Sequence, residues 1–584
     1  MVQWIKEHWP ECTTSLFLTI ASAVVITSQF TYLCDTNDDV LLRSIVSGTF
    51  MGTPDAHLIY IMYPLGWILK NLYQLLPNVF WYDVFMIGMH YMCWFLLAAK
   101  VGSLFENRWK KVVAVLLSYA IIVLIDLPYM VMHQYTVLAA VVGSVALLWI
   151  LTDCSENVRE FTRNHIVTVL AMTLCLWIRN QVFLMLMPFV GIAVIWRICK
   201  VSKEHIKKSI ARYSVALGVV VAIVLTSFII EKVAYSSEEW KEFLEYNEAR
   251  TDVYDFYQAP PYEIYKEAYA SLGFNEYDAL VIGTHNIGLM PEVDAQTLAT
   301  LADRSKEFRD WQEQYYSVYR KTMFSLMDSI LYNQVQPIGT VLIMMYAISI
   351  FISVIKDRKK DALVVLAVGL FQCLFVAYFL YQNRFPERVS YGFYLMQLVF
   401  LTGIQLQNVK AGKTVEKKSK QYFWNVIFAL LIAVVGINAG MYCYKNALDH
   451  NRERVAVATE WECIKQYCNQ HSEQQFFMKT NAVGAYCETM FTKGTLTTAN
   501  THYLGTWLLD SPLYETRLSN AGIMDCGSYL AQNENGCMLQ LGNETTDWLT
   551  EFYRAQGYRG TIEITDSIYL PDGSTLSVLQ MVEE

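Results

Sequence analysis

The chain has 584 residues, of which 54% are hydrophobic and only 17% are charged, and its formal net charge is −9. Soluble proteins carry about 25% charged residues, so this composition excludes a disordered chain and is typical of a membrane protein. The acidic balance also argues against a nucleic-acid binder, which would present a basic surface.

Runs of apolar residues divide the chain into predicted membrane spans. A hydrocarbon core about 30 Å thick requires about 20 apolar residues in a helix. About eleven segments meet this requirement: 14–34, 83–104, 112–130, 134–152, 165–178, 181–198, 214–231, 338–355, 362–381, 391–407 and 423–443. Residues 58–76 are also apolar, but they contain Pro64, Gly66 and Lys70, so we interpret them as an interfacial helix. The first span is too long for a cleaved signal peptide, and we expect it to remain as an anchor.

The basic residues predict how the chain is oriented. If the N-terminus is cytoplasmic and 58–76 is not a span, every basic cluster falls on the cytoplasmic side: 108–111, 159–163, 200–212, 356–360 and 410–420. Counting 58–76 as a span would break this pattern. We therefore expect an N-in, C-out protein whose outer regions are 35–82, 232–337 and 444–584.

Two of these outer regions have the size of small domains. Region 232–337 is acidic and rich in tyrosine, whereas 444–584 ends in two alternating strand patterns around a Pro571-Asp572-Gly573 turn. We predict an α-helical polytopic membrane module over 1–443. A small extracytoplasmic α/β or α+β domain is predicted over 444–584.

Five of the 13 cysteines lie in this C-terminal domain, on the side where disulfides persist. Cys526 and Cys537 would close a short loop as a disulfide, and free thiols are the alternative interpretation. Cys463 and Cys468 have no matching second pair, so a zinc site is not expected there.

An acidic pair, Asp38 and Asp39, follows the outer end of the first span. Adjacent carboxylates raise one another's pKa, so one of them can accept a proton near neutral pH. Carboxylate oxygens are also common ligands of divalent cations, so the pair could hold one, but the proposed chemistry does not require a metal ion. The structural alternative is a capped helix, because Asn37-Asp38-Asp39 precedes the apolar pattern VLLRSIVSG.

An acidic pair on the first outer loop, followed by juxtamembrane helices and many spans, resembles the GT-C superfamily of membrane glycosyltransferases. The resemblance is to the branch with O-antigen glucosyl transferases and protein mannosyltransferase-like enzymes. It implies a GT-C-like bundle, a polyprenyl-phosphate sugar donor, and inverting transfer to a glycan, lipid or protein acceptor outside the cell membrane. An acidic residue of the first outer loop is the proposed base in that family, and by position Asp38 and Asp39 both match. No cofactor is implied; Mg²⁺ or Mn²⁺ would be compatible with the pair.

Three arginines are candidates for binding the donor phosphate. Arg384 and Arg388 lie in YQNRFPERVSYGFY at the outer ends of two late spans, and Arg179 interrupts two apolar segments in WIRNQ. The planar guanidinium suits phosphate oxygens. The alternatives for Arg384 and Arg388 are an interfacial anchor, or a salt bridge to Glu387 or to an acidic residue of an outer loop.

Weaker candidates for contacts with the acceptor or the sugar lie elsewhere in the outer loops. Asp55 and His57 follow the acidic pair, His133 follows a later span, and the stretch YNEARTDVYDFYQAPPYE combines aromatic, amide and carboxylate groups that suit sugars. From that stretch we single out Asn247, Arg250 and Asp255, together with Asp252 and Tyr257. A solvated amphipathic helix is the alternative for this stretch. Arg43 is expected to pair with Asp39.

Two other functions compete with glycosyl transfer. A transporter or flippase of lipid-linked glycans would carry ionisable residues deep within its spans, whereas here the polar residues gather at the outer ends. A polysaccharide polymerase or ligase would account for paired arginines but would leave Asp38 and Asp39 unexplained. The C-terminal domain has no catalytic motif, and we expect it to be a lid or a glycan-recognition module.

Overall fold

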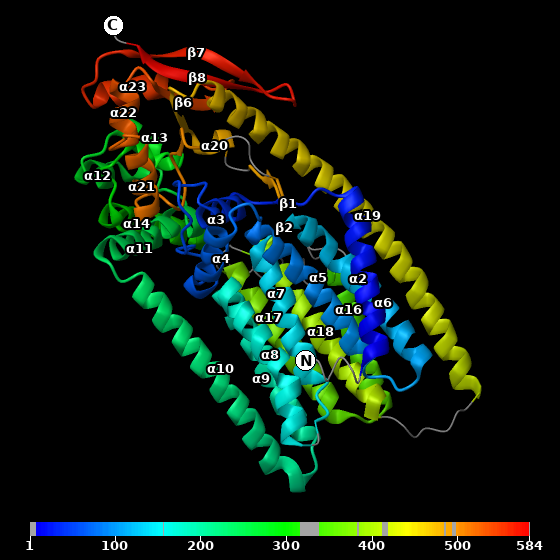
Figure 1. Cartoon of the computed structure of the whole chain (residues 1–584). Helices are drawn as coiled ribbons and strands as arrows, with labels where there is room; N and C mark the ends of the chain where they lie inside the picture. The colour runs from blue at the N-terminus through cyan, green and yellow to red at the C-terminus, as the bar shows by residue number, and fades with distance from the viewer. Residues whose placement is uncertain are drawn as a thin grey trace.

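The computed structural model describes residues 8–155, 157–315, 338–381, 385–411, 419–483, 486–492 and 498–582. A bundle of long helices forms one end of the molecule, and a head of shorter helices and a sheet forms the other (Figure 1). The loops between the first two long helices, the 235–315 region and the C-terminal residues all contribute to the head.

Every predicted span coincides with a helix. These helices are α2 (Trp9–Gln29), α5 (Trp81–Gly102), α6 (Arg108–Val131), α7 (Tyr135–Leu151), α8 (Val158–Ile178), α9 (Asn180–Lys200), α10 (Ile206–Ala234), α16 (Ile338–Ile355), α17 (Lys359–Tyr381), α18 (Glu387–Ala411) and α19 (Ser419–Gln470). Within the described residues, eight helices are long and apolar enough to cross a membrane, and 135–151 and 341–355 are shorter apolar helices. The predicted α-helical polytopic fold is therefore confirmed.

The position of α7 explains why a short helix belongs to this bundle. All of its 17 residues are buried, and it packs against α8, α9 and α18. Its side chains therefore contact protein on all sides, which an apolar sequence with no polar face permits. By contrast α10 buries only Val220 and Ser227, and it lies at the edge of the bundle (Figure 1). Its apolar surface suits contact with lipid.

The segment 58–76 forms a helix too short to cross a bilayer. This helix, α4, covers Tyr63–Leu75, with a proline in its first turn. At about 1.5 Å per residue it extends about 20 Å, less than the hydrocarbon core requires. It packs against α3 (Asn37–Ser47) and against α8 and α10. Its length agrees with the interfacial interpretation.

The 235–315 part of the head is helical. It contains α11 (Glu238–Thr251), a π-helical turn (Asp252–Phe256), α12 (Tyr262–Ser271), α13 (Glu276–Gly283), a 3₁₀ turn (Ile287–Leu289) and α14 (Ala295–Tyr315). It joins the C-terminal domain through backbone contacts such as Gly288 N–H to Leu504 O at 2.8 Å. The rest of the predicted outer loop, 316–337, lies outside the described residues.

The C-terminal domain is a small α/β unit, as predicted. Its five-stranded sheet has the order β5-β3-β6-β8-β7, in which β3 pairs parallel with β5 and β6, and β8 pairs antiparallel with β6 and β7. The strands are β3 (Gln475–Met478), β5 (Thr501–Tyr503), β6 (Gly536–Leu541), β7 (Thr561–Tyr569) and β8 (Thr575–Val582). Helices α20 (Thr480–Val483), α21 (Pro512–Asn520), α22 (Cys526–Gln532) and α23 (Asp547–Ala555) accompany them.

Two features of this domain bear on the sequence analysis. The predicted boundary at residue 443 lies inside α19, a single helix of 52 residues that links bundle and head (Figure 1). All 13 cysteines lie within described residues, and all are free thiols, so Cys526 and Cys537 form no disulfide here.

A second, three-stranded sheet joins segments that are far apart in the sequence. Strand β1 (Leu33–Cys34) pairs parallel with β2 (Met132–His133) and antiparallel with β4 (Glu488–Thr489). It therefore connects the segment between α2 and α3, the α6–α7 junction and the C-terminal domain. Helix α3 begins three residues after β1. The small sheet thus fixes the position of the acidic pair.

Candidate functional site

The acidic pair lies in the first turn of α3. Thr36 is the N-cap with extended backbone angles, and it makes no side-chain cap hydrogen bond. Asp38 and Asp39 are the acidic residues of the first turn, where the helix dipole favours negative charge. The helix start predicted from Asn37-Asp38-Asp39 is confirmed, but neither carboxylate acts as a cap.

The side chain of Asp39 is fully buried and its oxygens are occupied. One oxygen accepts hydrogen bonds from the Tyr82 hydroxyl at 3.0 Å and the Tyr135 N–H at 3.3 Å, and the other accepts one from the Thr36 hydroxyl at 3.1 Å. Burial raises the pKa of Asp39 to about 8, and these hydrogen bonds oppose the shift. Asp39 therefore anchors α3 to the start of α5 and α7.

His133 lies on the other side of Asp39. It is fully buried, and its Nε2 atom is 3.5 Å from Asp39 Oδ1. Neither ring nitrogen makes a hydrogen bond with the described residues. The structure therefore places His133 beside the acidic pair, and its predicted contact with the acceptor or sugar stays a prediction.

Asp38 has a different environment from its neighbour. It is half-buried, and burial raises the pKa of its carboxyl. The positive charges of Arg388 and Arg179 oppose this shift, while the negative charge of Asp255 adds to it. Two predicted phosphate ligands and one predicted acceptor contact therefore lie within electrostatic range of Asp38.

Arg179 occupies the turn between α8 and α9, as predicted. Its guanidinium lies over the ring of Tyr60 at 5.0 Å and over that of Tyr135 at 5.4 Å. Among the described residues it has no hydrogen-bond or ion-pair partner, so its N–H groups are available to a ligand. Cation–π contacts of this kind hold the planar group in position without using its donors.

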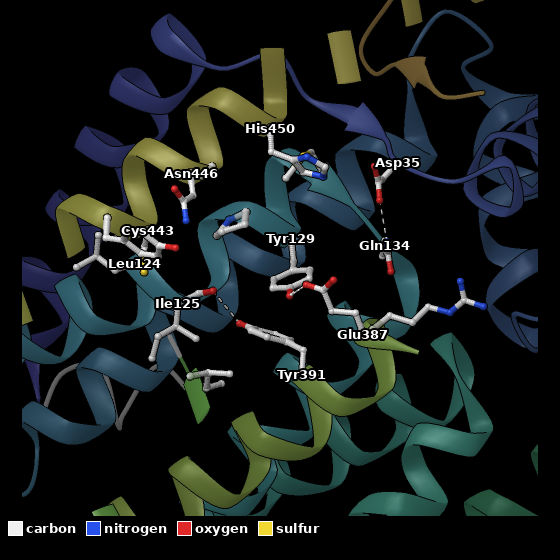
Figure 2. Close-up of a pocket in the computed structure, with 16 residues that line it drawn as sticks. Asp35, Leu124, Ile125, Tyr129, Gln134, Glu387, Tyr391, Cys443, Asn446 and His450 are labelled. Carbon is white, nitrogen blue, oxygen red and sulfur yellow. Dashed lines mark hydrogen bonds between the residues drawn. The ribbon is translucent and has the colours of Figure 1, made fainter. Parts of the chain in front are cut away.

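Arg388 is the second residue of α18 and lines a cavity of about 240 Å³ between α6, α18 and α19. Arg388 forms no ion pair with Glu387 among the described residues, and the Glu387 carboxylate instead accepts a hydrogen bond from Tyr129 at 2.6 Å (Figure 2). Within the described residues Arg388 makes no hydrogen bond or ion pair. Its partner in the sequence prediction, Arg384, lies outside the described residues.

The same cavity receives polar groups from three other segments. Asp35 accepts a hydrogen bond from Gln134 at 2.8 Å, and Asn446 and His450 project from α19 (Figure 2). Its other wall is apolar and aromatic, including Leu124 and Tyr391. The cavity thus has one polar side and one apolar side next to Arg388.

The outer-loop candidates form a cluster of their own. Arg250 is buried and donates to Asn247 at 3.1 Å, and its guanidinium lies 3.5 Å from the Asp255 carboxylate. Both charges of this pair influence the ionisation of Tyr60, as do Asp38 and Arg179. The cluster therefore lies within electrostatic range of Tyr60.

Asp55 and His57 have structural contacts instead. Their side chains form a 2.7 Å hydrogen bond, and the His57 ring stacks on Trp240 with centroids 4.6 Å apart. His57 also lies 3.2 Å from the carbonyl of Ala234 at the end of α10. These contacts therefore join the two residues to each other and to α10 and α11.

The structure also identifies aromatic residues that the sequence analysis missed. Tyr60 contacts Arg179 and lies 4.8 Å from the ring of Trp507. The Trp507 indole N–H favours the ionised form of Asp38, yet it is buried and no described group accepts a hydrogen bond from it with good geometry. Ile59 has φ of 62°, which is costly for a β-branched residue and marks the turn that presents Tyr60.

Arg43 does not pair with Asp39. It forms an ion pair with Glu488 of β4, lies 3.6 Å from Asp83, and donates to the Thr489 carbonyl at 3.0 Å. The expectation was wrong because the C-terminal domain, more than 400 residues away, supplies the partner. Arg43 thus fastens α3 to that domain.

Within the part of the chain that the structure describes, no group of three or more His, Cys, Asp or Glu residues is arranged to hold a metal ion. No protein-family model and no curated protein matches the sequence. Two solved structures are similar: ArnT from Cupriavidus metallidurans bound to undecaprenyl phosphate, at 11% identity and TM-score 0.37, and ArnT from the same organism in the apo state, at 10% and 0.38. Each comparison covers 96% of this chain and 97% of that chain.

Proposed function

We propose that the protein is a membrane glycosyltransferase that moves a sugar from a polyprenyl-phosphate carrier to an acceptor at the outer face of the membrane. The observation that carries the proposal is the environment of Asp38. A half-buried carboxylate with a raised pKa lies within electrostatic range of Arg179 and Arg388, and neither guanidinium group has a hydrogen-bond or ion-pair partner among the described residues.

The proposed chemistry divides the work between these groups. Asp38 takes the proton of an acceptor hydroxyl, whose oxygen then attacks the anomeric carbon of the donor sugar. The bond between that carbon and the phosphate oxygen breaks, and Arg179 and Arg388 hold the negative charge of the departing polyprenyl phosphate. A single displacement of this kind inverts the anomeric configuration, in agreement with the family resemblance.

Asp38 is the better candidate for the base, because Asp39 has no oxygen available. Asp39 already accepts three hydrogen bonds and is fully buried. Its role in this proposal is to hold α3, and with it Asp38, against α5 and α7. His133, at 3.5 Å from Asp39, supports the same position.

The remaining groups define where the acceptor lies. Tyr60 and Trp507 offer aromatic faces, and the buried indole N–H of Trp507 is a donor without a good acceptor in the described residues. The charges of Arg250 and Asp255 act on Tyr60, and Asn247 accepts a hydrogen bond from Arg250. Sugars bind to such combinations of aromatic and polar groups.

Donor binding tests the role of the arginines. Undecaprenyl phosphate, the lipid in the ArnT structure, is titrated into the purified protein in nanodiscs and measured by native mass spectrometry. A hydrogen bond from a charged donor contributes about 1.5–3 kcal/mol, so Arg179→Ala and Arg388→Ala should each weaken binding by about tenfold or more. Arg452→Ala, at an exposed arginine of α19, is the matched control.

Undecaprenol serves as the chemical control, because it lacks the phosphate. Equal binding of undecaprenol and undecaprenyl phosphate, or full binding by both arginine variants, would contradict the proposed phosphate site.

Sugar transfer tests the base. Several undecaprenyl-phosphate sugars are added, one at a time, to membranes that contain the protein and its native acceptors. The undecaprenyl phosphate that is released by transfer is then measured. Loss of a general base typically costs about 10²-fold or more, so Asp38→Asn should reduce release to near the level of membranes without the protein. Asp39→Asn keeps the shape of its side chain and should retain measurable transfer. Normal transfer by Asp38→Asn would exclude the assignment.

A further inference from the structure

A large polar cavity lies on the face of α3 opposite Asp38. Its volume is about 760 Å³, within the range of small-molecule sites. A helix turns about 100° per residue, so Ser47 lies about 180° around α3 from Asp38. Ser47 and Arg43 line the cavity on one side, and the C-terminal domain lines the other. We call this space the junction cavity.

The cationic side chains of the junction cavity already have partners. Arg43 forms an ion pair with Glu488 and lies 3.6 Å from Asp83. Lys465 lies 3.1 Å from the same Glu488 carboxylate. Arg517 is buried and donates to backbone carbonyl oxygens, including two hydrogen bonds of 2.6 Å and 3.2 Å to one carbonyl of β5. With its cations paired in this way, the wall is poorly suited to a phosphate or carboxylate ligand.

Among the described residues, the wall instead contains an unpaired hydrogen-bond acceptor and aromatic side chains. One oxygen of the buried Asp83 accepts the Phe491 N–H at 2.7 Å, but the other has no partner among the described residues. Tyr73 and Tyr503 line the same space, as does the amide of Asn520. Such a wall suits a ligand that donates hydroxyl hydrogens and presents C–H groups to aromatic rings.

We propose that the junction cavity binds a neutral carbohydrate of one to a few sugar units. The site is separate from the proposed transfer site, and the binding does not depend on that reaction. Because α3 forms a wall of the cavity and also carries Asp38, an occupant would contact the helix that positions the proposed base. The C-terminal domain would then be a carbohydrate-recognition module.

The test uses the full chain in nanodiscs without donor lipid. Neutral di- to tetrasaccharides of glucose, galactose, mannose and N-acetylglucosamine are compared with a glucuronate-containing disaccharide and inorganic phosphate by native mass spectrometry. At least one neutral saccharide should bind. Binding of none of them, or tighter binding of the anionic probes, would overturn the proposal.

Cavity-filling variants locate the binding. Ser47→Trp fills the cavity from α3 and should weaken binding by at least about tenfold. Ala521→Trp fills it from the C-terminal domain, so the result does not depend on α3 tolerating the change. Ser519→Trp makes the same change at an exposed position outside the lining and should leave binding unchanged. Full binding by both folded filling variants would overturn the proposal.

Two further measurements separate this site from the transfer site. Asp38→Asn should bind the saccharide like the wild type, whatever its effect on transfer. If the occupant is part of the acceptor glycan, added saccharide should raise the apparent KM for the native acceptor; if it is a free effector, kcat should change instead. Loss of saccharide binding in Asp38→Asn would contradict a separate site.

Discussion

Replacing Asp39 by asparagine should make the protein more resistant to unfolding at neutral and alkaline pH. Asparagine has the same shape, and its oxygen can accept the hydrogen bonds from Tyr82 and Tyr135. Its amide N–H can donate to the Thr36 hydroxyl, which reverses the present bond. The substitution therefore removes the ionisation of a buried group while it keeps the contacts.

The expected size of the effect follows from the pKa of Asp39. Burial raises this pKa from 3.8 to about 8. Below about pH 4 the carboxyl is protonated in both the folded and the unfolded chain, and its contribution to stability is fully present. Between about pH 4 and 8 the unfolded chain releases the proton while the folded chain retains it, so the free energy of unfolding falls. Each pKa unit corresponds to about 1.4 kcal/mol, so the difference between the folded and unfolded pKa limits this loss to a value on the order of 5 kcal/mol.

The assay is the apparent melting temperature of the purified protein between about pH 5 and pH 9, followed by intrinsic fluorescence. The melting temperature of the wild type should fall relative to that of Asp39→Asn as the pH rises. Asp303→Asn, at an exposed position of α14, should run parallel to the wild type. Parallel curves for Asp39→Asn, or a growing advantage of the wild type at high pH, would refute the reasoning.

Two further substitutions test how the head is assembled. In Gly505→Ala the new methyl group would collide with the His285 carbonyl, so the protein should lose about 1–3 kcal/mol of stability, seen as a lower melting temperature. Gly283→Ala is the control, because a methyl group there meets open space and should change the stability very little. Arg43→Ala removes the cation beside the buried Asp83 and one of the two cations paired with Glu488, and it should cost about 3–5 kcal/mol in the same melting assay. Lys241→Ala, at an exposed ion pair, should change little. Equal effects within either pair would contradict the packing described for the head.

Hydropathy was sufficient to predict the helical bundle. Each of the eleven predicted spans coincides with a helix, since a run of apolar residues in a membrane satisfies its backbone groups only within a helix or a closed barrel. The exclusion of 58–76 rested on Pro64, Gly66 and Lys70, and the helix found there has only 13 residues. The sequence did not predict that 135–151 would be buried on all sides, because apolar composition is the same for lipid and protein neighbours.

The local pattern predicted which acidic residues would lie together, but not their separate environments. Asp38 and Asp39 are neighbours on one helix, and their difference arises from partners at Tyr82, Tyr135 and Arg388. Such contacts depend on how distant helices pack, which periodicity does not encode. Tyr60 and Trp507 were missed for the same reason, since single aromatic residues in loops carry no signal of their own.

The small sheet formed by β1, β2 and β4 has a consequence for how the protein is made. Its third strand, at residues 488–489, leaves the ribosome about 450 residues after the acidic pair. At about 5–20 residues per second, this delay is roughly half a minute to a minute and a half. Throughout that time Arg43 lacks its partner Glu488 and the strand that precedes α3 has a free edge. A truncated chain that inserts all its membrane helices but lacks the last hundred residues would therefore keep an unpaired edge of β1, which proteases that degrade misfolded membrane proteins could recognise.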